Sequence, residues 1–330
     1  MRELLRRHPS EARLSLALAA LCVFLSLASN SFLTPGNLTS LLDNNAVNVI
    51  WAVGLLAVLV AGGIDISFAV AASVTQYLCA LAFPHLGGGG WIVGVALSAA
   101  LGALIGCLNA ALIHYFRIVS IVVTIATYNA MFGLLMFFTS GRSIYDLPDW
   151  WTRPVDLLPW RIPGADLGLP VAAMAAAMAA TAVLLSRTNI GRQLTAFGDN
   201  PEGARRAGVD PARMLFIAFG WAGAMAGIGG LLQVNLAQEV VPNALLGREL
   251  DVLAAVVLGG ARLGGGRGSV TGCLLGVLFV ATLQNGLNLL GVSPYAFKMM
   301  IGIAILVAIS TSNIDFSAAR APLRKGAAGA

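Results

Sequence analysis

The stretch Trp91–His114, WIVGVALSAALGALIGCLNAALIH, decides the fold class of this sequence. It holds 24 residues without Asp, Glu, Lys or Arg, and about 20 apolar residues suffice for a helix to cross the hydrocarbon core of a membrane. Similar runs recur along the chain of 330 residues, which is 58% apolar and 11% charged. A soluble domain carries roughly 25% charged residues. The sequence therefore predicts an all-α membrane protein, a polytopic helical bundle of about ten transmembrane helices.

The apolar segments outline a transmembrane domain over 14–312, flanked by cytoplasmic tails at 1–13 and 313–330. Segment 250–260 would cover only about 16 Å at 1.5 Å per residue, so we expect a short or broken crossing there. The ten predicted segments are 14–33, 42–61, 66–83, 91–114, 118–139, 169–186, 214–236, 250–260, 269–290 and 296–312.

The basic residues predict the orientation of the chain in the cytoplasmic membrane. With both termini in the cytoplasm, the inner loops and tails carry fifteen Lys and Arg residues and the outer loops carry four. This asymmetry is typical of membrane proteins, whose cytoplasmic loops are richer in positive charge. The net charge of +5 is therefore explained without nucleic acid, which we do not expect as a partner.

The outer loop 140–168 combines four aspartates with three tryptophans. Tryptophan at a membrane surface is ordinarily an interfacial anchor. A lid or a docking surface for an external partner is the alternative. The residues concerned are Asp146, Asp149, Asp156, Asp166, Trp150, Trp151 and Trp160.

The inner loop 187–213 contains the signals of one short helix. Asn200 suits the cap before the helix, Pro201 its first position, Glu202 its positive end, and Gly208 its closure. The next helix is expected to start at Asp210-Pro211. This element is either an interfacial connector or a rigid knob that transmits force to a cytoplasmic partner. We expect proline at position 202 to break it.

The chain shows no sign of enzymatic chemistry, and we expect neither a metal nor a cofactor of its own. The glycine-rich stretch 259–269 lacks the lysine of a phosphate-binding loop. The three histidines are scattered, and the four cysteines form no ligand-spaced pair. Asp65 is the one carboxylate between spans that stands out, in GGIDIS (62–67), as a cap for the next helix or a gating group.

The spans do contain uncharged amide side chains. Such groups often join helices inside a membrane. Together they also suit a path for a neutral polyhydroxy solute, because they exchange hydrogen bonds with it without selecting an ion. The possible path residues are Asn48, Asn129, Gln233, Asn235, Gln284, Asn285 and Asn288.

Three stretches resemble the permease subunits of bacterial ABC importers for monosaccharides, in the branch for ribose and related sugars. Ala61–Ser67 is similar to that family's GGIDLS signature, and Gly198–Val209 to its cytoplasmic coupling segment. Glu249–Gly266 continues the likeness to Asn285–Ser293, so that it covers roughly 35–310. The resemblance implies a type II ABC-importer-like fold.

The resemblance also implies partners and residue roles. A separate ATPase subunit would dock on the coupling residues, an extracytoplasmic sugar-binding protein would meet the outer loops, and two permease chains would pair within the lipid. The implied gating or capping residues are Gly62, Gly63, Asp65 and Ser67. The implied coupling residues are Asp199, Asn200, Pro201, Glu202, Ala204, Arg205, Arg206 and Gly208.

Several functions stay open on sequence alone. Departures from the family pattern, among them Phe68-Ala69 and Ala261-Arg262, leave ribose, rhamnose, xylose, a polyol or an autoinducer-type compound as cargo. Branched-chain amino acid permeases share the Leu-Gly-Gly region but not the GGID segment. A secondary carrier would need an ion-coupling site in the spans, and carboxylates there are scarce.

Overall fold

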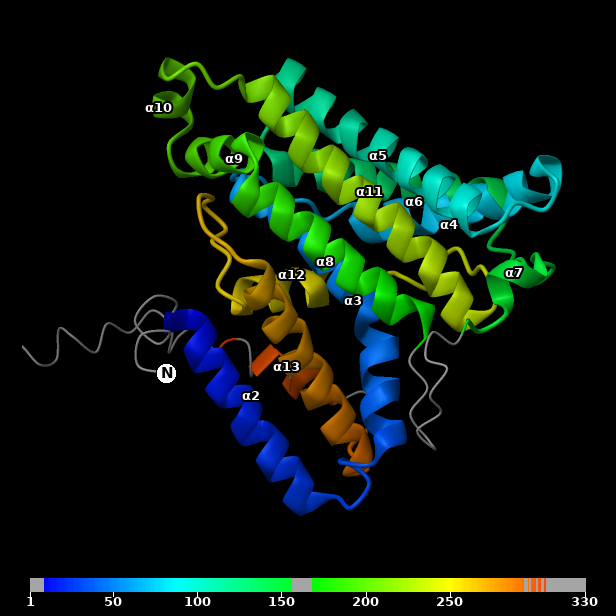
Figure 1. Cartoon of the computed structure of the whole chain (residues 1–330). Helices are drawn as coiled ribbons and strands as arrows, with labels where there is room; N and C mark the ends of the chain where they lie inside the picture. The colour runs from blue at the N-terminus through cyan, green and yellow to red at the C-terminus, as the bar shows by residue number, and fades with distance from the viewer. Residues whose placement is uncertain are drawn as a thin grey trace, which may run out of the picture.

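The chain folds into a bundle of α-helices (Figure 1). The structure is a computed structural model that describes residues 9–155 and 168–293, together with isolated positions between 296 and 306. The long helices are α2 (Pro9–Ala28), α3 (Pro35–Val60), α4 (Phe68–Ala82), α5 (Trp91–Phe116), α6 (Ser120–Thr139), α8 (Leu169–Arg187), α11 (Pro211–Ala237) and α13 (Val270–Leu289). The short elements are the 3-10 helix η1 (Phe83–Leu86), α7 (Asp149–Thr152), α9 (Asn189–Asp199), α10 (Pro201–Arg206) and α12 (Arg248–Leu258).

Eight of the ten predicted segments coincide with helices that are long and apolar enough to span a membrane. Predicted segment 250–260 coincides with α12, whose 11 residues are too few for a full crossing. Predicted segment 296–312 lies largely outside the described residues, as do the tail 313–330 and most of the tail 1–13.

α3 begins at Pro35 rather than at the predicted residue 42, because proline suits the first helical position. Asn44, Asn45 and Asn48 consequently lie inside this helix, about 13 to 20 Å from its start at 1.5 Å per residue. Asn45 and Asn48 are half-buried there, and Asn44 is exposed.

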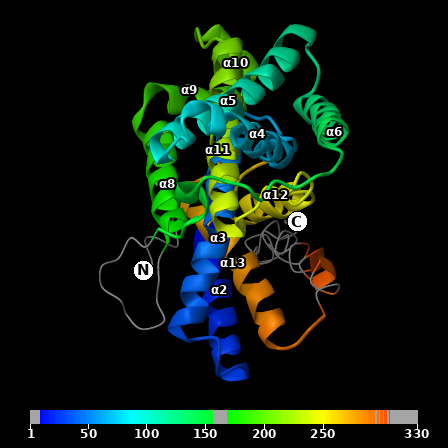
Figure 2. The ribbon, with the colours of Figure 1, turned by 90° about the vertical axis from the view of Figure 1, so that its right-hand side faces the viewer.

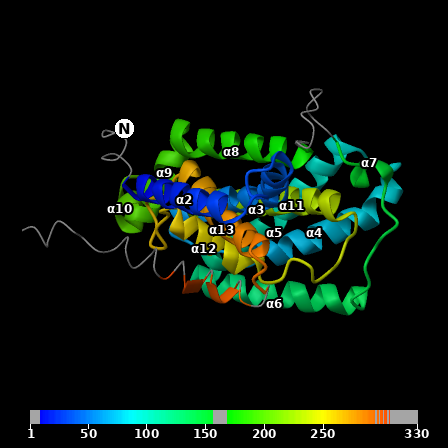
Figure 3. The same ribbon diagram turned by 90° about the horizontal axis from the view of Figure 1, so that it is seen from below.

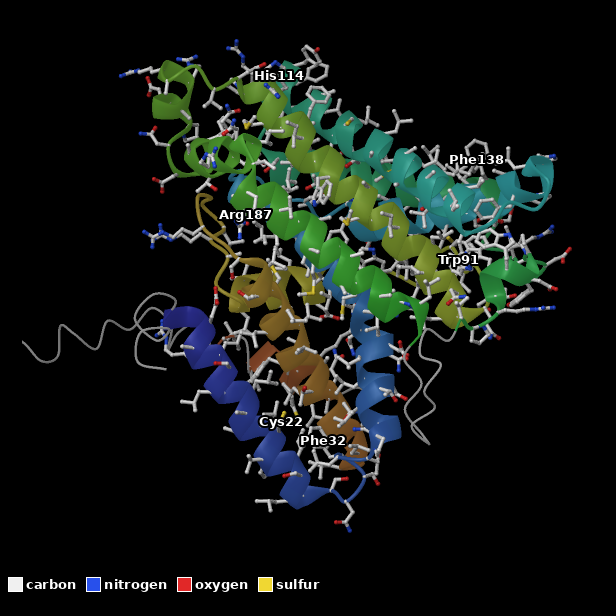
Figure 4. All side chains as sticks on the ribbon, in the orientation of Figure 1. Cys22, Phe32, Trp91, His114, Phe138 and Arg187 are labelled. Atoms are coloured by element: carbon white, nitrogen blue, oxygen red, sulfur yellow. The ribbon has the colours of Figure 1, made fainter. Side chains whose placement is uncertain are left out.

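α3 and α11 form the centre of the bundle. In the most apolar 18 residues of α3, 78% are buried, against 11% in α2 and 17% in α6. Figures 2 and 3 show α8 and α6 on opposite sides of this centre. Phe138 on α6 points away from the bundle (Figure 4) and is 78% exposed, as expected for a side chain in lipid.

Glycines bring α5 and α11 into backbone contact. A Cβ atom on Gly106 would lie 2.0 Å from the carbonyl oxygen of Phe219, and one on Gly223 would lie 2.1 Å from that of Gly102. Gly102 and Gly106, like Gly223 and Gly227, are four residues apart, the spacing that lets membrane helices approach closely. This contact fixes the position of α11 against α5. The predicted coupling residues precede the start of α11, and Gln233 and Asn235 lie near its end.

The connections group at two ends of the bundle, as predicted. At the inner end, the backbone N–H of Gly266 donates to the carbonyl oxygen of Val60, 2.9 Å away. At the outer end, the backbone N–H of Gly168 donates to Oδ1 of Asp43, 3.1 Å away. Which end faces the cytoplasm stays a prediction from the basic residues.

Candidate functional site: inner-end helices and a polar cavity

Two short helices, α9 and α10, occupy the inner end between α8 and α11 (Figure 1). Thr188 caps α9, because its hydroxyl oxygen accepts the backbone N–H of Gly191, 3.1 Å away. Asn200 caps α10 in the same way, with its side-chain oxygen 2.9 Å from the backbone nitrogen of Gly203. Each helix therefore starts at a defined residue.

The predicted short helix is present as α10, and a second helix that was not predicted, α9, precedes it within 187–213. α9 has only 11 residues and mixes polar with apolar ones, so it does not stand out in a search for membrane spans. Its apolar residues Ile190, Leu194 and Phe197 nevertheless have the i, i+4, i+7 spacing of one helix face, a signal that could have revealed it. Leu194 and Phe197 are buried in the core, so α9 is packed against the bundle.

α10 follows the predicted capping scheme. Pro201 is its first residue, and Glu202 in the first turn pairs with Arg206, 2.6 Å away, on the exposed face. Gly208 then adopts a φ of +87°, which an L side chain rarely adopts. The predicted coupling residues extend from the last residue of α9 to just past the end of α10, and of them only Ala204 is buried. They are Asp199, Asn200, Pro201, Glu202, Ala204, Arg205, Arg206 and Gly208.

Glycines connect α9 to the membrane helices. A Cβ atom on Gly198 would lie 1.9 Å from the carbonyl oxygen of Val60, the last residue of α3. A Cβ atom on Gly265 would lie 2.5 Å from the carbonyl oxygen of Gly198. The backbones of α9, α3 and the loop before α13 thus touch, with Gly62 alongside at a φ of +83°.

Asp65 lies in a buried polar cluster just beyond this junction. Its Oδ1 accepts both the backbone N–H and the hydroxyl of Ser67, each 2.7 Å away. Asn109 of α5 donates to the Ser67 hydroxyl oxygen at 2.8 Å. The cap position of α4 belongs to Ser67, so Asp65 acts on the cap residue and does not cap the helix itself. Gly63 packs closely against Phe219.

A polar cavity of about 290 Å³ lies between α3, α12 and α13. Three walls contribute hydrogen-bonding groups, and valine and alanine side chains complete the lining. The first turn of the short helix α12 contributes one acidic and one basic side chain to the lining of the cavity. The polar lining residues are Asn44, Asn45, Asn48, Arg248, Asp251 and Gln284.

The structure separates the predicted path residues. Asn48 and Gln284 line the cavity, and Gln233 lies behind it, accepting a hydrogen bond from Arg248 at 2.9 Å. The other four lie elsewhere. Asn235 donates to a carbonyl oxygen of the outer segment, Asn285 pairs with Asn37 of α3, and Asn129 and Asn288 are exposed.

The outer segment around α7 is anchored on the bundle. The Trp151 side chain is buried, and its Nε1 donates to the carbonyl oxygen of Leu231 at 2.8 Å. Asn235 Nδ2 donates to the Trp151 carbonyl oxygen at 2.6 Å. Trp151 is therefore a core residue, and an interfacial role does not fit it. Asp156, Trp160 and Asp166 lie outside the described residues.

A family model described as the permease component of branched-chain amino acid transport systems matches residues 37–309. The chain belongs to this permease family. The match includes α3 to α13, and thus both α9–α10 and the cavity. The resemblance read from the three sequence stretches is confirmed at the level of the family.

Curated relatives of this permease match over nearly their whole length. The ribose import permease protein RbsC of Escherichia coli K12 is 33% identical over 92% of this chain and 94% of its own. That of Bacillus subtilis 168 is 34% identical over 89% and 90%. The autoinducer 2 import system permease protein LsrC of Photorhabdus luminescens is 30% identical over 88% and 87%. No solved structure matches.

Four cavity residues of the permease were absent from the predicted path. Asn44 and Asn45 look like the start of a span, where polar residues are ordinary. Arg248 and Asp251 stand outside the longest apolar runs, so they look like loop charges. The available signal is the unusually short apolar segment 250–260, since broken membrane helices tend to present their ends to a binding site.

Proposed function

We propose that this permease forms the membrane path of an ATP-driven importer that carries a monosaccharide or similar polyhydroxy solute into the cytoplasm. A separate ATPase subunit binds and hydrolyses the nucleotide, and this chain needs no cofactor of its own. An extracytoplasmic sugar-binding protein delivers the cargo to the outer end. A second permease chain, identical or paralogous, completes the path within the lipid.

The exposed surface of α9 and α10 is the observation that supports an ATPase partner. α10 has six residues, a capped start and a glycine just after its end. A connection between two membrane spans does not require so well defined a helix. Gly198 places this surface in backbone contact with the end of α3. Movement of the docked ATPase would therefore reach a helix that lines the cavity, as alternating access requires.

The full-length likeness to two ribose import permeases supports a sugar as cargo. The relative named for autoinducer 2 and the family description for branched-chain amino acids keep two other cargoes as alternatives. A secondary carrier is less favoured, because a cytoplasmic docking surface would have no use in it.

The test is a gentle purification of the tagged chain from native membranes, followed by mass spectrometry and reconstitution into vesicles. We expect an ATPase subunit to copurify in stoichiometric amount. With ATP on the ATPase side and the loaded binding protein on the other, D-ribose should enter and L-leucine should not.

Three results would contradict parts of the proposal. Solute movement without ATP, by a chain that purifies alone, would indicate a secondary carrier. ATP-driven uptake of L-leucine would assign the amino acid branch. ATP-driven uptake that continues without any second protein would contradict the proposal of a separate ATPase partner.

A further inference from the structure

Asn48, one of the residues that line the cavity, has a buried hydrogen-bond acceptor that lacks a donor among the described residues. Asn48 donates from Nδ2 to Oδ1 of Asn45, 3.1 Å away, and Asn45 donates in turn to the carbonyl oxygen of Leu41. The carbonyl oxygen Oδ1 of Asn48 is buried and has no partner within the described part of the chain. Such an atom costs free energy unless a ligand or water donates to it.

Arg248 is held at the cavity by groups behind it. One guanidinium nitrogen donates to Oε1 of Gln233 on α11 at 2.9 Å, and the guanidinium carbon lies 6.0 Å from the centre of the Trp51 ring. A guanidinium has five N–H donors. Arg248 therefore keeps donors available while its position is determined by α3 and α11.

Asp251 lies three residues after Arg248 in α12 and lines the same cavity. Within residues 9–155 and 168–293 its carboxylate forms neither an ion pair within 4 Å nor a hydrogen bond, although Arg248 and Lys298 both act on it electrostatically. An ionised carboxylate accepts up to about four hydrogen bonds. The cavity thus presents acceptors on α3 and α12 beside a donor on α12.

Hydroxyl groups match this arrangement better than a zwitterion does. Each hydroxyl donates one hydrogen bond and accepts others, so a polyol satisfies Asn48, Asp251 and Arg248 from one compact frame. An amino acid with a hydrocarbon side chain would satisfy the charged pair at one end and leave the α3 amides without partners. A volume of about 290 Å³ lies at the lower limit of known ligand pockets, which suits a small solute.

We propose that Asn48, Arg248 and Asp251 form the cargo-binding site of this permease, and that its ligand is a neutral polyhydroxy compound of monosaccharide size. Asp251 and the carbonyl oxygen of Asn48 accept hydrogen bonds from ligand hydroxyls, and Arg248 donates to a hydroxyl or ring oxygen. Gln233 is a positioning residue for Arg248. This inference rests on the proposed function and deepens it.

The test compares Asp251→Asn with the unchanged chain, each copurified with its ATPase subunit in lipid nanodiscs. Asparagine keeps the shape of aspartate but loses the charge and one acceptor. Saturation-transfer-difference NMR with D-ribose as the probe should show ribose protons in contact with the unchanged protein. In Asp251→Asn the affinity should fall about tenfold or more, since a hydrogen bond to a charged group is lost.

Glu239→Gln is the matched control. It removes one negative charge from the connection before α12, and Glu239 does not line the cavity. Its ribose signal in nanodiscs should equal that of the unchanged chain, and so should its maximal uptake rate after reconstitution into vesicles. Gln284→Leu, which changes a lining residue on α13, is a second variant in case Asp251→Asn does not fold. It too should weaken the ribose signal severalfold.

Ribose binding and uptake that are unchanged in both cavity variants would overturn the proposed site. L-leucine binding that depends on Asp251 would overturn the ligand class and keep the site. Failure of the proposed function is a different result, because the unchanged chain would then show no ATP-driven uptake of D-ribose.

Discussion

At the residue scale, Gly198 is the most constrained position of the inner end. Any Cβ atom there would lie 1.9 Å from the carbonyl oxygen of Val60 and 2.7 Å from the backbone nitrogen of Gly266. Both neighbours are backbone atoms, which cannot rotate away as a side chain can. The glycine is thus required by packing, although its position in α9 would otherwise favour alanine.

Gly198→Ala should destabilise the protein. The clash costs about 1–3 kcal/mol, which exceeds the gain of up to about 1 kcal/mol in helix propensity. Thermal unfolding of the purified chain should show a lower midpoint. Gly264→Ala in the adjoining loop is the control, because a Cβ atom there meets nothing within 4 Å. Equal midpoints for the two variants would contradict this account of the junction.

The helix caps at single residues could be predicted from the sequence, whereas the directions of side chains inside the membrane spans could not. The caps at Asn200 and Asp210 depend on neighbours along the chain, and both have the predicted positions. Asn285 meets Asn37 across 248 residues, and no sequence spacing indicates that contact. Amide residues in a membrane helix have similar local patterns whether they line a cavity or join two helices.

At the scale of elements, α10 depends on its backbone hydrogen bonds. The N–H of Ala204 donates to the carbonyl oxygen of Asn200 at 2.9 Å and closes the first turn of the short helix. Glu202 is the second residue of the helix, where a missing N–H costs little. Proline at 202 is therefore a weaker test than the sequence alone suggested.

Ala204→Pro should unfold α10 while the chain still inserts into the membrane. The substitution removes that hydrogen bond and brings the ring against the carbonyl of Asn200, at a cost of about 3 kcal/mol or more. We expect the ATPase subunit to be lost on purification and ATP-driven uptake to stop. Retention of a stoichiometric ATPase by a well-inserted variant would contradict docking on α10. Carbonate extraction of the membranes checks insertion.

Elements with strong apolar runs were predicted, whereas α9 and the role of α12 were missed because their signals are weaker. The eight long helices follow from hydropathy because lipid leaves few other solutions for the backbone. α9 is amphipathic and short, so its existence depends on burial of Leu194 and Phe197 beneath the bundle. α12 was expected as a short crossing, but the cavity beside it comes from packing with α3 and α13.

At the scale of the whole molecule, two opposite ends carry different chemistry. The inner end carries charged, capped short helices, and the outer end carries an aromatic group of Phe83, Trp91, Trp150 and Trp151. α11 joins the two ends over 27 residues, about 40 Å at 1.5 Å per residue. The orientation of this axis is a prediction from charge.

Cysteine labelling tests the orientation. In a background without the four native cysteines, Tyr145→Cys and Arg205→Cys place exposed thiols at the outer and inner ends. A membrane-impermeant maleimide added to intact cells should label position 145 and leave position 205 unlabelled until the cells are permeabilised. Labelling of position 205 in intact cells would invert the topology.

The contacts that join α2 and α3 to α13 and its cap residue have a consequence for the timing of biosynthesis. Asn37 pairs with Asn285, and Glu11 accepts a hydrogen bond from Ser269, 258 residues later. At roughly 5–20 residues per second, a ribosome needs about 12–50 s to reach the second partner. During that time α2 and α3 are already in the membrane while these partners are still unmade. Newly made chains must therefore be sheltered by the insertion machinery until α13 arrives, and a nonsense codon before α13 should give a product that quality-control proteases remove.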